Sequence, residues 1–187
     1  MHEPASPPPL RMDALKSLLL VVCVGLVATV VILLCASGGD GVFEHKGLAR
    51  VEHSKDDVFE WLCEPELRVQ WIAGLSSSKS DALQVEKGSH LVEIVGGGAD
   101  RRERKIEVLE AEPGLAVVLR ITEPGRTFDV HYRLSPNQSS KRTRVDYTLS
   151  GHFDAWWARV LEPFMSARLV EELEADLARL DQKLRQA

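Results

Sequence analysis

The side chains that most often perform acid–base, nucleophilic or metal chemistry are few in this sequence and widely separated. The six histidines show no metal-ligand spacing. His131 lies between the apolar residues Val130 and Tyr132, so we predict it on the outer face of a strand, and one imidazole alone does not make a general base. Cys63 is the only cysteine outside the apolar N-terminal segment, and we predict that it is a small buried helix residue. We therefore predict no catalytic residue, no metal site and no cofactor.

Three polar side chains are better placed to orient a bound molecule. Tyr132 and Tyr147 are the only tyrosines, and both fall in the inward phase of an alternating segment. A buried hydroxyl needs a hydrogen-bond partner, so the two could hold the polar end of a ligand; simple core packing is the alternative. Arg104 is in phase with Ile106 and Val108, which predicts a cation at the mouth of a cavity, unless the charged run around it is a solvated strand end.

Alternating apolar and polar residues predict an antiparallel sheet that would position these side chains. Turn residues rich in glycine and proline separate the segments. The predicted strands are 42–53, 90–95, 102–109, 115–122, 127–134 and 143–149, with 76–82 as one more at the edge. The inward residues of the central strands are predicted to be Ile106, Val108, Leu115, Val117, Leu119, Ile121, Phe128, Val130, Tyr132 and Leu134. We expect Leu119 and Phe128 to lie on the floor of a cavity.

Helices are predicted at two places around this sheet. Ser54 can cap a helix over 56–63, and Pro65 opens another over 65–71. From residue 154 to the C-terminus the apolar period becomes three to four, which predicts a long helix with one apolar face. That face comprises Trp156, Val160, Leu161, Phe164, Leu169, Val170, Leu173, Leu177, Leu180 and Leu184. Trp156 and Phe164 complete the candidate cavity set. Pro163 is expected to kink the helix or to end a short first turn.

An apolar segment near the N-terminus predicts membrane attachment. Residues 18–36 are nineteen positions without a charge, about the length that spans a bilayer. We predict a disordered tail over 1–17, a single transmembrane helix over 18–38 and a globular domain over 39–187. A cleaved signal peptide is the alternative, although its apolar core is usually shorter. Arg11 and Lys16 precede the segment, which favours a cytoplasmic N-terminus and an extracytoplasmic domain.

Charge excludes one class of partner. The chain has 23 basic and 28 acidic residues, which gives a net charge of −5. Acidic and basic residues are equal in number in residues 1–38, so the predicted domain carries the whole net charge. We therefore predict no nucleic-acid binding.

The order of elements resembles the helix-grip fold of the START-like, or SRPBCC, superfamily. Residues 54–62 leading to Trp71, and residues 106–113, are similar to its polyketide cyclase/dehydrase branch. So are residues 143–147, Gly151, Pro163 and residues 173–180. The resemblance implies an α+β fold: a curved antiparallel sheet of six to seven strands, two short helices and a long C-terminal helix, as in Bet v 1 and START proteins. It implies the fold more strongly than the activity.

This fold predicts a cavity between the sheet and the long helix. Our leading hypothesis is a membrane-tethered domain that binds a hydrophobic or amphipathic small molecule, such as a lipid or an isoprenoid. A structural or interaction domain with a closed core is the first alternative. A cyclase/dehydrase-type enzyme is the second.

Overall fold

The structure, a computed structural model, describes residues 12–36, 42–137, 139–155, 157–158 and 161–186. It divides into two compact units, Met1–Gly39 and Asp40–Ala187. Most of the predicted tail, residues 1–11, lies outside the described residues, as do residues 37–38 of the predicted span.

The described part of the first unit is the helix α1 (Met12–Ala36). It begins before the predicted tail ends, because Met12–Ser17 holds no proline or glycine and consists mainly of good helix formers. Among the described residues, no helix is both long and apolar enough to cross a membrane. The structure therefore does not support the predicted single span.

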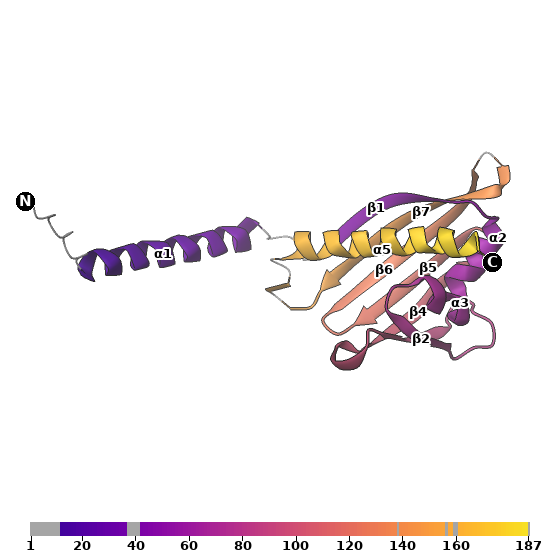
Figure 1. The fold of residues 1–187 in the computed structure, drawn as a ribbon, viewed down its shortest axis with the longest axis horizontal. Coiled ribbons are helices and arrows are strands. Elements are labelled where there is room, and N and C mark those ends of the chain that lie inside the picture. Colours follow the sequence, from indigo (N-terminus) through magenta and orange to yellow (C-terminus); the bar gives the residue numbers. More distant parts are fainter. Residues whose placement is uncertain (1–11, 37–41, 138, 156, 159–160, 187) are drawn as a thin grey trace, which may run out of the picture. The chain divides into compact units, whose positions relative to one another are not determined.

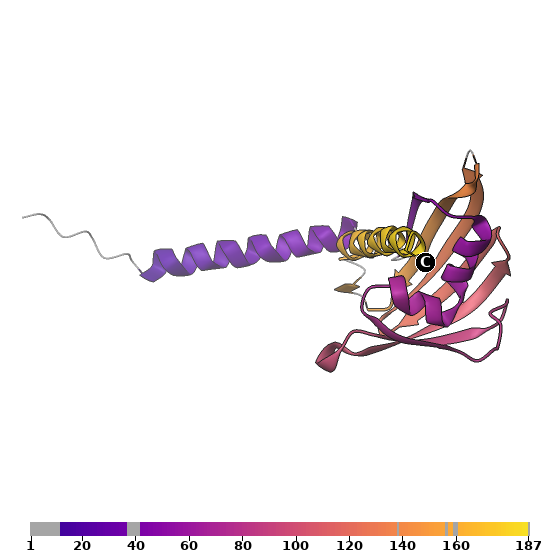
Figure 2. The same cartoon turned by 45° about the vertical axis from the view of Figure 1, so that its right-hand side comes forward.

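Seven antiparallel strands form the core of the second unit, in the order β1-β7-β6-β5-β4-β3-β2. Strands β2 to β7 follow one another as a meander, and β1 pairs with β7 (Figure 1). The strands are β1 (Val42–Val51), β2 (Leu75–Ser80), β3 (His90–Val95), β4 (Arg102–Glu112), β5 (Ala116–Glu123), β6 (Arg126–Asn137) and β7 (Ser139–Phe153). Figure 2 shows the sheet curving around the helices on its inner face. The predicted α+β helix-grip arrangement is confirmed for this unit.

The inner face of the sheet is built largely from the predicted residues, with one error. Leu115 is 52% exposed, because β5 begins one residue later and Leu115 lies in the turn, where its N–H donates to Glu112 O. A register shift in β4 between Val108 and Glu110 locally changes the alternation, and Val118 is buried as well.

Two short helices close one end of the sheet. Helix α2 (Lys55–Cys63) begins at the predicted cap, where Ser54 Oγ accepts from the N–H of Asp57 at 3.2 Å. Helix α3 (Pro65–Trp71) follows with its proline in the first turn. Trp71 Nε1 donates to Trp61 O at 2.9 Å and joins the two helices.

The long helix α5 (Glu162–Leu184) crosses the inner face of the sheet (Figures 1 and 2). It begins eight residues later than residue 154, and Pro163 lies in its first turn, where a missing N–H costs no helical hydrogen bond. Leu161 and Phe164 were expected to be buried but are exposed. The buried contacts of α5 lie farther along, at Leu169, Leu177, Leu180 and Leu184.

Candidate ligand cavity

A cavity of about 910 Å³ lies between the inner face of the sheet, α3 and α5, which lines it from Pro163 to Arg179. Its volume falls within the roughly 300–1,000 Å³ of small-molecule sites. Side chains from β3, β5, β6, β7 and both helices make its apolar wall: Trp71, Ile72, Val95, Leu119, Ile121, Phe128, Val130, Leu149, Phe164, Leu169 and Leu173. The space is therefore shaped for an apolar body.

Most of the predicted cavity residues meet at this space. Five of the seven line it: Arg104, Leu119, Phe128, Tyr132 and Phe164. They come from β4, β5, β6 and α5, so the structure brings together positions up to 60 residues apart in the chain. Trp156 lies outside the described residues.

Tyr147 lies elsewhere, between β1 and α5, and is not among the residues that line the cavity. Its hydroxyl donates to Glu174 Oε1 at 2.6 Å. Its ring covers Gly47, where an added Cβ would stand 2.1 Å from the hydroxyl oxygen. Burial, together with Glu174, raises the pKa of this hydroxyl. Tyr147 belongs to β7, so this hydrogen bond joins α5 to β7 while the ring covers Gly47 of β1.

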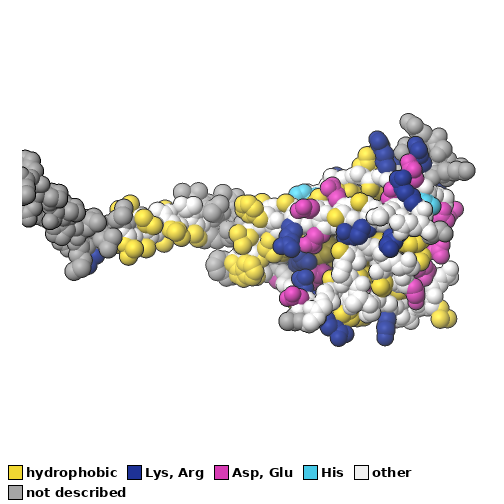
Figure 3. Space-filling model, viewed as in Figure 1, with side chains coloured by type: hydrophobic (Ala, Val, Ile, Leu, Met, Phe, Trp, Pro, Cys, Tyr) yellow, Lys and Arg dark blue, Asp and Glu magenta, His cyan; other side chains and the backbone are white. Residues whose placement is uncertain are grey.

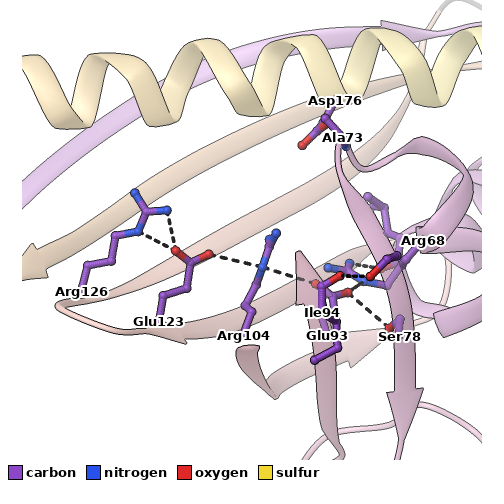
Figure 4. A network of polar contacts seen from close by, with 11 residues as sticks. Arg68, Ala73, Ser78, Glu93, Ile94, Arg104, Glu123, Arg126 and Asp176 are labelled. Atoms are coloured by element: carbon purple, nitrogen blue, oxygen red, sulfur yellow. Dashed lines mark hydrogen bonds and ion pairs between the residues drawn. The ribbon is translucent and has the colours of Figure 1, made fainter. Parts of the chain in front are cut away.

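Ionic side chains form a continuous line along one wall, which we call the charge ladder: Arg68, Glu93, Arg104, Glu123 and Arg126 (Figure 4). Arg68 Nε donates to Glu93 Oε1 at 2.6 Å. Arg104 Nε lies 3.5 Å from Glu93 Oε2 and 3.3 Å from Glu123 Oε1. Arg126 Nη2 lies 2.5 Å from Glu123 Oε2.

Strand register produces the charge ladder. Glu93 of β3 pairs directly with Arg104 of β4, and Glu123 of β5 pairs with Arg126 of β6. Arg104 and Glu123 lie one position beyond the last β4–β5 pair. Opposite charges at neighbouring cross-strand positions stabilise a sheet. Arg68 reaches this line from α3 and also donates to Leu62 O at 2.8 Å.

Four members of the charge ladder were missed by sequence reasoning: Arg68, Glu93, Glu123 and Arg126. Glu93 left a clear signal. Glu93 stands between Leu91 and Val95 in the inward phase of an alternating strand. A carboxylate in an apolar phase indicates a buried ion pair. Arg68 had no such signal, because α3 is too short for its periodicity to be informative.

Electrostatics separates the ionised groups from the neutral ones. Burial alone would raise the pKa of Glu93, but the charges of Arg68 and Arg104, with the hydrogen bonds from Arg68 and Ser78, outweigh it and hold this pKa below 4.5. Burial raises the pKa of Tyr132, so its hydroxyl stays protonated. Burial also raises the pKa of Cys63 to about 12, which leaves an unreactive thiol in α2 as predicted.

The lowered pKa of Glu93 predicts a specific acid sensitivity. Because the folded pKa lies below the unfolded one, the stabilisation is complete above about pH 5 and is lost as pH falls through 4.5 and below. One such proton changes the unfolding free energy by at most about 1.4 kcal/mol per pH unit. Urea midpoints measured from pH 7 to pH 3 should fall less steeply for Glu93→Gln than for the wild type. Equal slopes would contradict the prediction, whatever the variant's stability at pH 7.

Comparisons with known proteins identify solved structures with a similar fold. Neither protein-family models nor curated proteins give a match to this chain. Among solved structures, a START superfamily protein from Mycobacterium smegmatis matches with a TM-score of 0.65 at 14% identity, over 76% of this chain and 97% of the other. Zhui aromatase/cyclase from Streptomyces sp. R1128 matches with a TM-score of 0.64 at 13% identity, over 78% of this chain and 94% of the other.

A conserved protein from Geobacillus kaustophilus gives a similar result, a TM-score of 0.64 at 14% identity over 77% of this chain and 96% of the other. At these identities the likeness establishes the fold. The second unit has the helix-grip fold that START and aromatase/cyclase proteins share.

Proposed function

We propose that this protein binds an amphipathic small molecule of the lipid or isoprenoid class in the cavity between the sheet and α5. The observation that carries the proposal is the 910 Å³ space, lined by aliphatic and aromatic side chains from several elements. A closed core would fill this space with side chains, because protein interiors pack with few voids larger than a water molecule. The cavity therefore favours binding over a purely structural domain.

Binding is also better supported than catalysis. The described residues that line the cavity include no histidine and no cysteine. The buried hydroxyl there belongs to Tyr132, whose raised pKa makes it a neutral donor and a poor base. Glu123 lies against both Arg104 and Arg126, so its negative charge is engaged by two cations. These groups can hold and orient a ligand.

Native mass spectrometry of the full chain, purified gently from its own host, tests this proposal. We expect a stoichiometric bound molecule that organic solvent releases. Ala167 and Ala175 line the cavity from α5 and are themselves exposed, so Ala167→Trp with Ala175→Trp should obstruct the cavity without disturbing the core. Ala178→Trp, on an exposed position of α5 that does not line the cavity, is the matched control.

We expect the bound molecule to be lost from the double variant and kept by the control. A folded wild-type chain that is repeatedly empty, and that takes up no added lipid, would contradict the proposal and favour an interaction domain.

We propose in addition that α1 attaches the protein to a membrane, with the second unit outside the cytoplasm. The observation that supports attachment is a set of eight large apolar side chains that are 44–68% exposed: Leu19, Leu20, Val21, Val22, Val24, Leu26, Val27 and Val30 (Figure 3). Apolar side chains exposed together in this way mark interaction surfaces.

Flotation of the full chain with liposomes tests the attachment. We expect the wild type to float and Val22→Lys with Leu26→Lys to remain in the dense fraction. Leu83→Lys, on a fully exposed side chain of the second unit, is the control and should float. Protease added to intact cells should cleave the second unit if it lies outside the cytoplasm, and full protection would contradict that placement.

A further inference from the structure

We propose that the cavity binds an anionic amphiphile, a molecule with a carboxylate or phosphate head and an apolar tail, and that Arg104 binds its anionic head. This inference rests on the proposed binding function and specifies the chemical class of its ligand.

The charge balance of the charge ladder is the first ground. It contains three guanidinium groups and two carboxylates, so it carries one uncompensated positive charge. The side chains of Arg68, Arg104 and Arg126 are 3%, 14% and 20% exposed, and those of Glu93 and Glu123 are 0% and 9% exposed. An unpaired charge away from water is costly, whereas a paired one is tolerated. One ligand anion would bring the sum to zero.

Unequal hydrogen bonding identifies Arg104 as the group that receives this anion. Arg68 donates to Glu93 and to Leu62 O, and Arg126 donates twice to Glu123. Arg104 Nε has two carboxylates within 3.5 Å, yet it is buried without a hydrogen bond in the described part of the chain. Glu93 Oε2, 3.5 Å from this nitrogen, also lacks a hydrogen bond among the described residues. Buried polar atoms are normally satisfied, so the Nε–H of Arg104, which neither carboxylate satisfies, can take a further acceptor.

Arg104 lies where an atom of a bound ligand could accept its hydrogen bond. Arg104 lines the cavity, and Figure 4 shows its guanidinium rising from β4 toward α5, between Glu93 and Glu123. The same cavity is lined by the apolar Leu119, Ile121 and Phe128. A head on Arg104 would therefore place an attached chain against an apolar surface.

Guanidinium geometry sets the class of head. A guanidinium binds carboxylate and phosphate oxygens through two parallel N–H donors. A neutral alcohol would leave the extra positive charge in place, and a cationic head would be repelled by it. The same chemistry fits a fatty-acid carboxylate, a phosphorylated lipid or free inorganic phosphate, so the probes must separate these sources.

The test measures binding of four probes to the delipidated full chain under one set of solution conditions: dodecanoate, dodecyl phosphate, dodecanol and inorganic phosphate. The variant is Arg104→Met, in which Glu93 keeps Arg68 and Glu123 keeps Arg126 as partners. The control is Arg133→Met, which removes the same charge from an exposed position on the outer face of β6.

We expect at least one of the two anionic amphiphiles to bind the wild type at least tenfold more tightly than dodecanol. Arg104→Met should abolish this difference while still binding dodecanol, and Arg133→Met should preserve it. Preference for dodecyl phosphate over dodecanoate, or the reverse, then identifies the head.

Other outcomes would overturn the inference. Equal binding of acid and alcohol to the wild type would refute the anionic head while leaving the proposed function intact. Equal loss of every probe in Arg104→Met would show that Arg104 only maintains the wall. Tight binding of inorganic phosphate without an effect of the tail would indicate a site for a free anion. Failure of all four probes to bind would refute the proposed function itself for ligands of this size.

Discussion

Arg68→Met is expected to lower the free energy of unfolding by about 3–5 kcal/mol, the usual effect of leaving one member of a buried ion pair unpaired. Arg68 and Glu93 are 3% and 0% exposed, and the Nε–Oε1 distance is 2.6 Å. Arg104 cannot replace the lost partner fully, because its Nε forms no hydrogen bond to Glu93. Urea unfolding of the full chain, followed by far-UV circular dichroism, measures the change.

An exposed ion pair provides the matched control. Arg144 lies 2.7 Å from Asp146, but the two side chains are 52% and 39% exposed. Water screens such a pair, so Arg144→Met should cost less than about 1 kcal/mol. The double variant Arg68→Met with Glu93→Met should regain much of the loss, because it removes both buried charges. Equal effects at Arg68 and Arg144 would show that burial does not govern the energy of the charge ladder.

The outline of this fold was predictable because a sheet with one apolar face leaves a period of two in the sequence. Strand β3 was predicted at its observed bounds, and the cap at Ser54 was found from a serine preceding two aspartates and an apolar periodic segment. Tertiary packing was harder to predict. Tyr147 has the inward phase of a cavity residue, yet Gly47 on the neighbouring strand leaves room for its ring, and Glu174 binds its hydroxyl.

The charge ladder marks the limit of prediction from periodicity. Arg104 could be recognised as an inward cation, but its partners come from β3 and β5, and Arg68 reaches Glu93 from α3. The alignment of these elements depends on strand register and on the path of a short helix. A sequence pattern shows which face a side chain shares within one strand and leaves open which strand lies beside it. That Arg104 Nε forms no hydrogen bond to the described residues, although two carboxylates lie near it, could be found only once these neighbours were in place.

The two ends of α5 are expected to respond differently to truncation. Leu180 is fully buried against the core, so Leu180→Ala should cost about 2–5 kcal/mol of unfolding free energy. Phe164 lines the cavity but is 76% exposed, so Phe164→Ala should change stability by no more than about 0.5 kcal/mol. Urea unfolding of both variants, with occupancy from native mass spectrometry, checks the pair.

Ligand retention should be affected in the opposite order: more by Phe164→Ala than by Leu180→Ala. Because Phe164 covers part of the cavity at the beginning of α5, its truncation should speed the loss of a bound amphiphile, whereas Leu180→Ala should retain the ligand as long as it is folded. The later turns of α5 would then anchor the helix, and the first turns would control access. If Phe164→Ala unfolds as readily as Leu180→Ala, the beginning of α5 belongs to the core; if ligand release is unchanged, access to the cavity lies elsewhere.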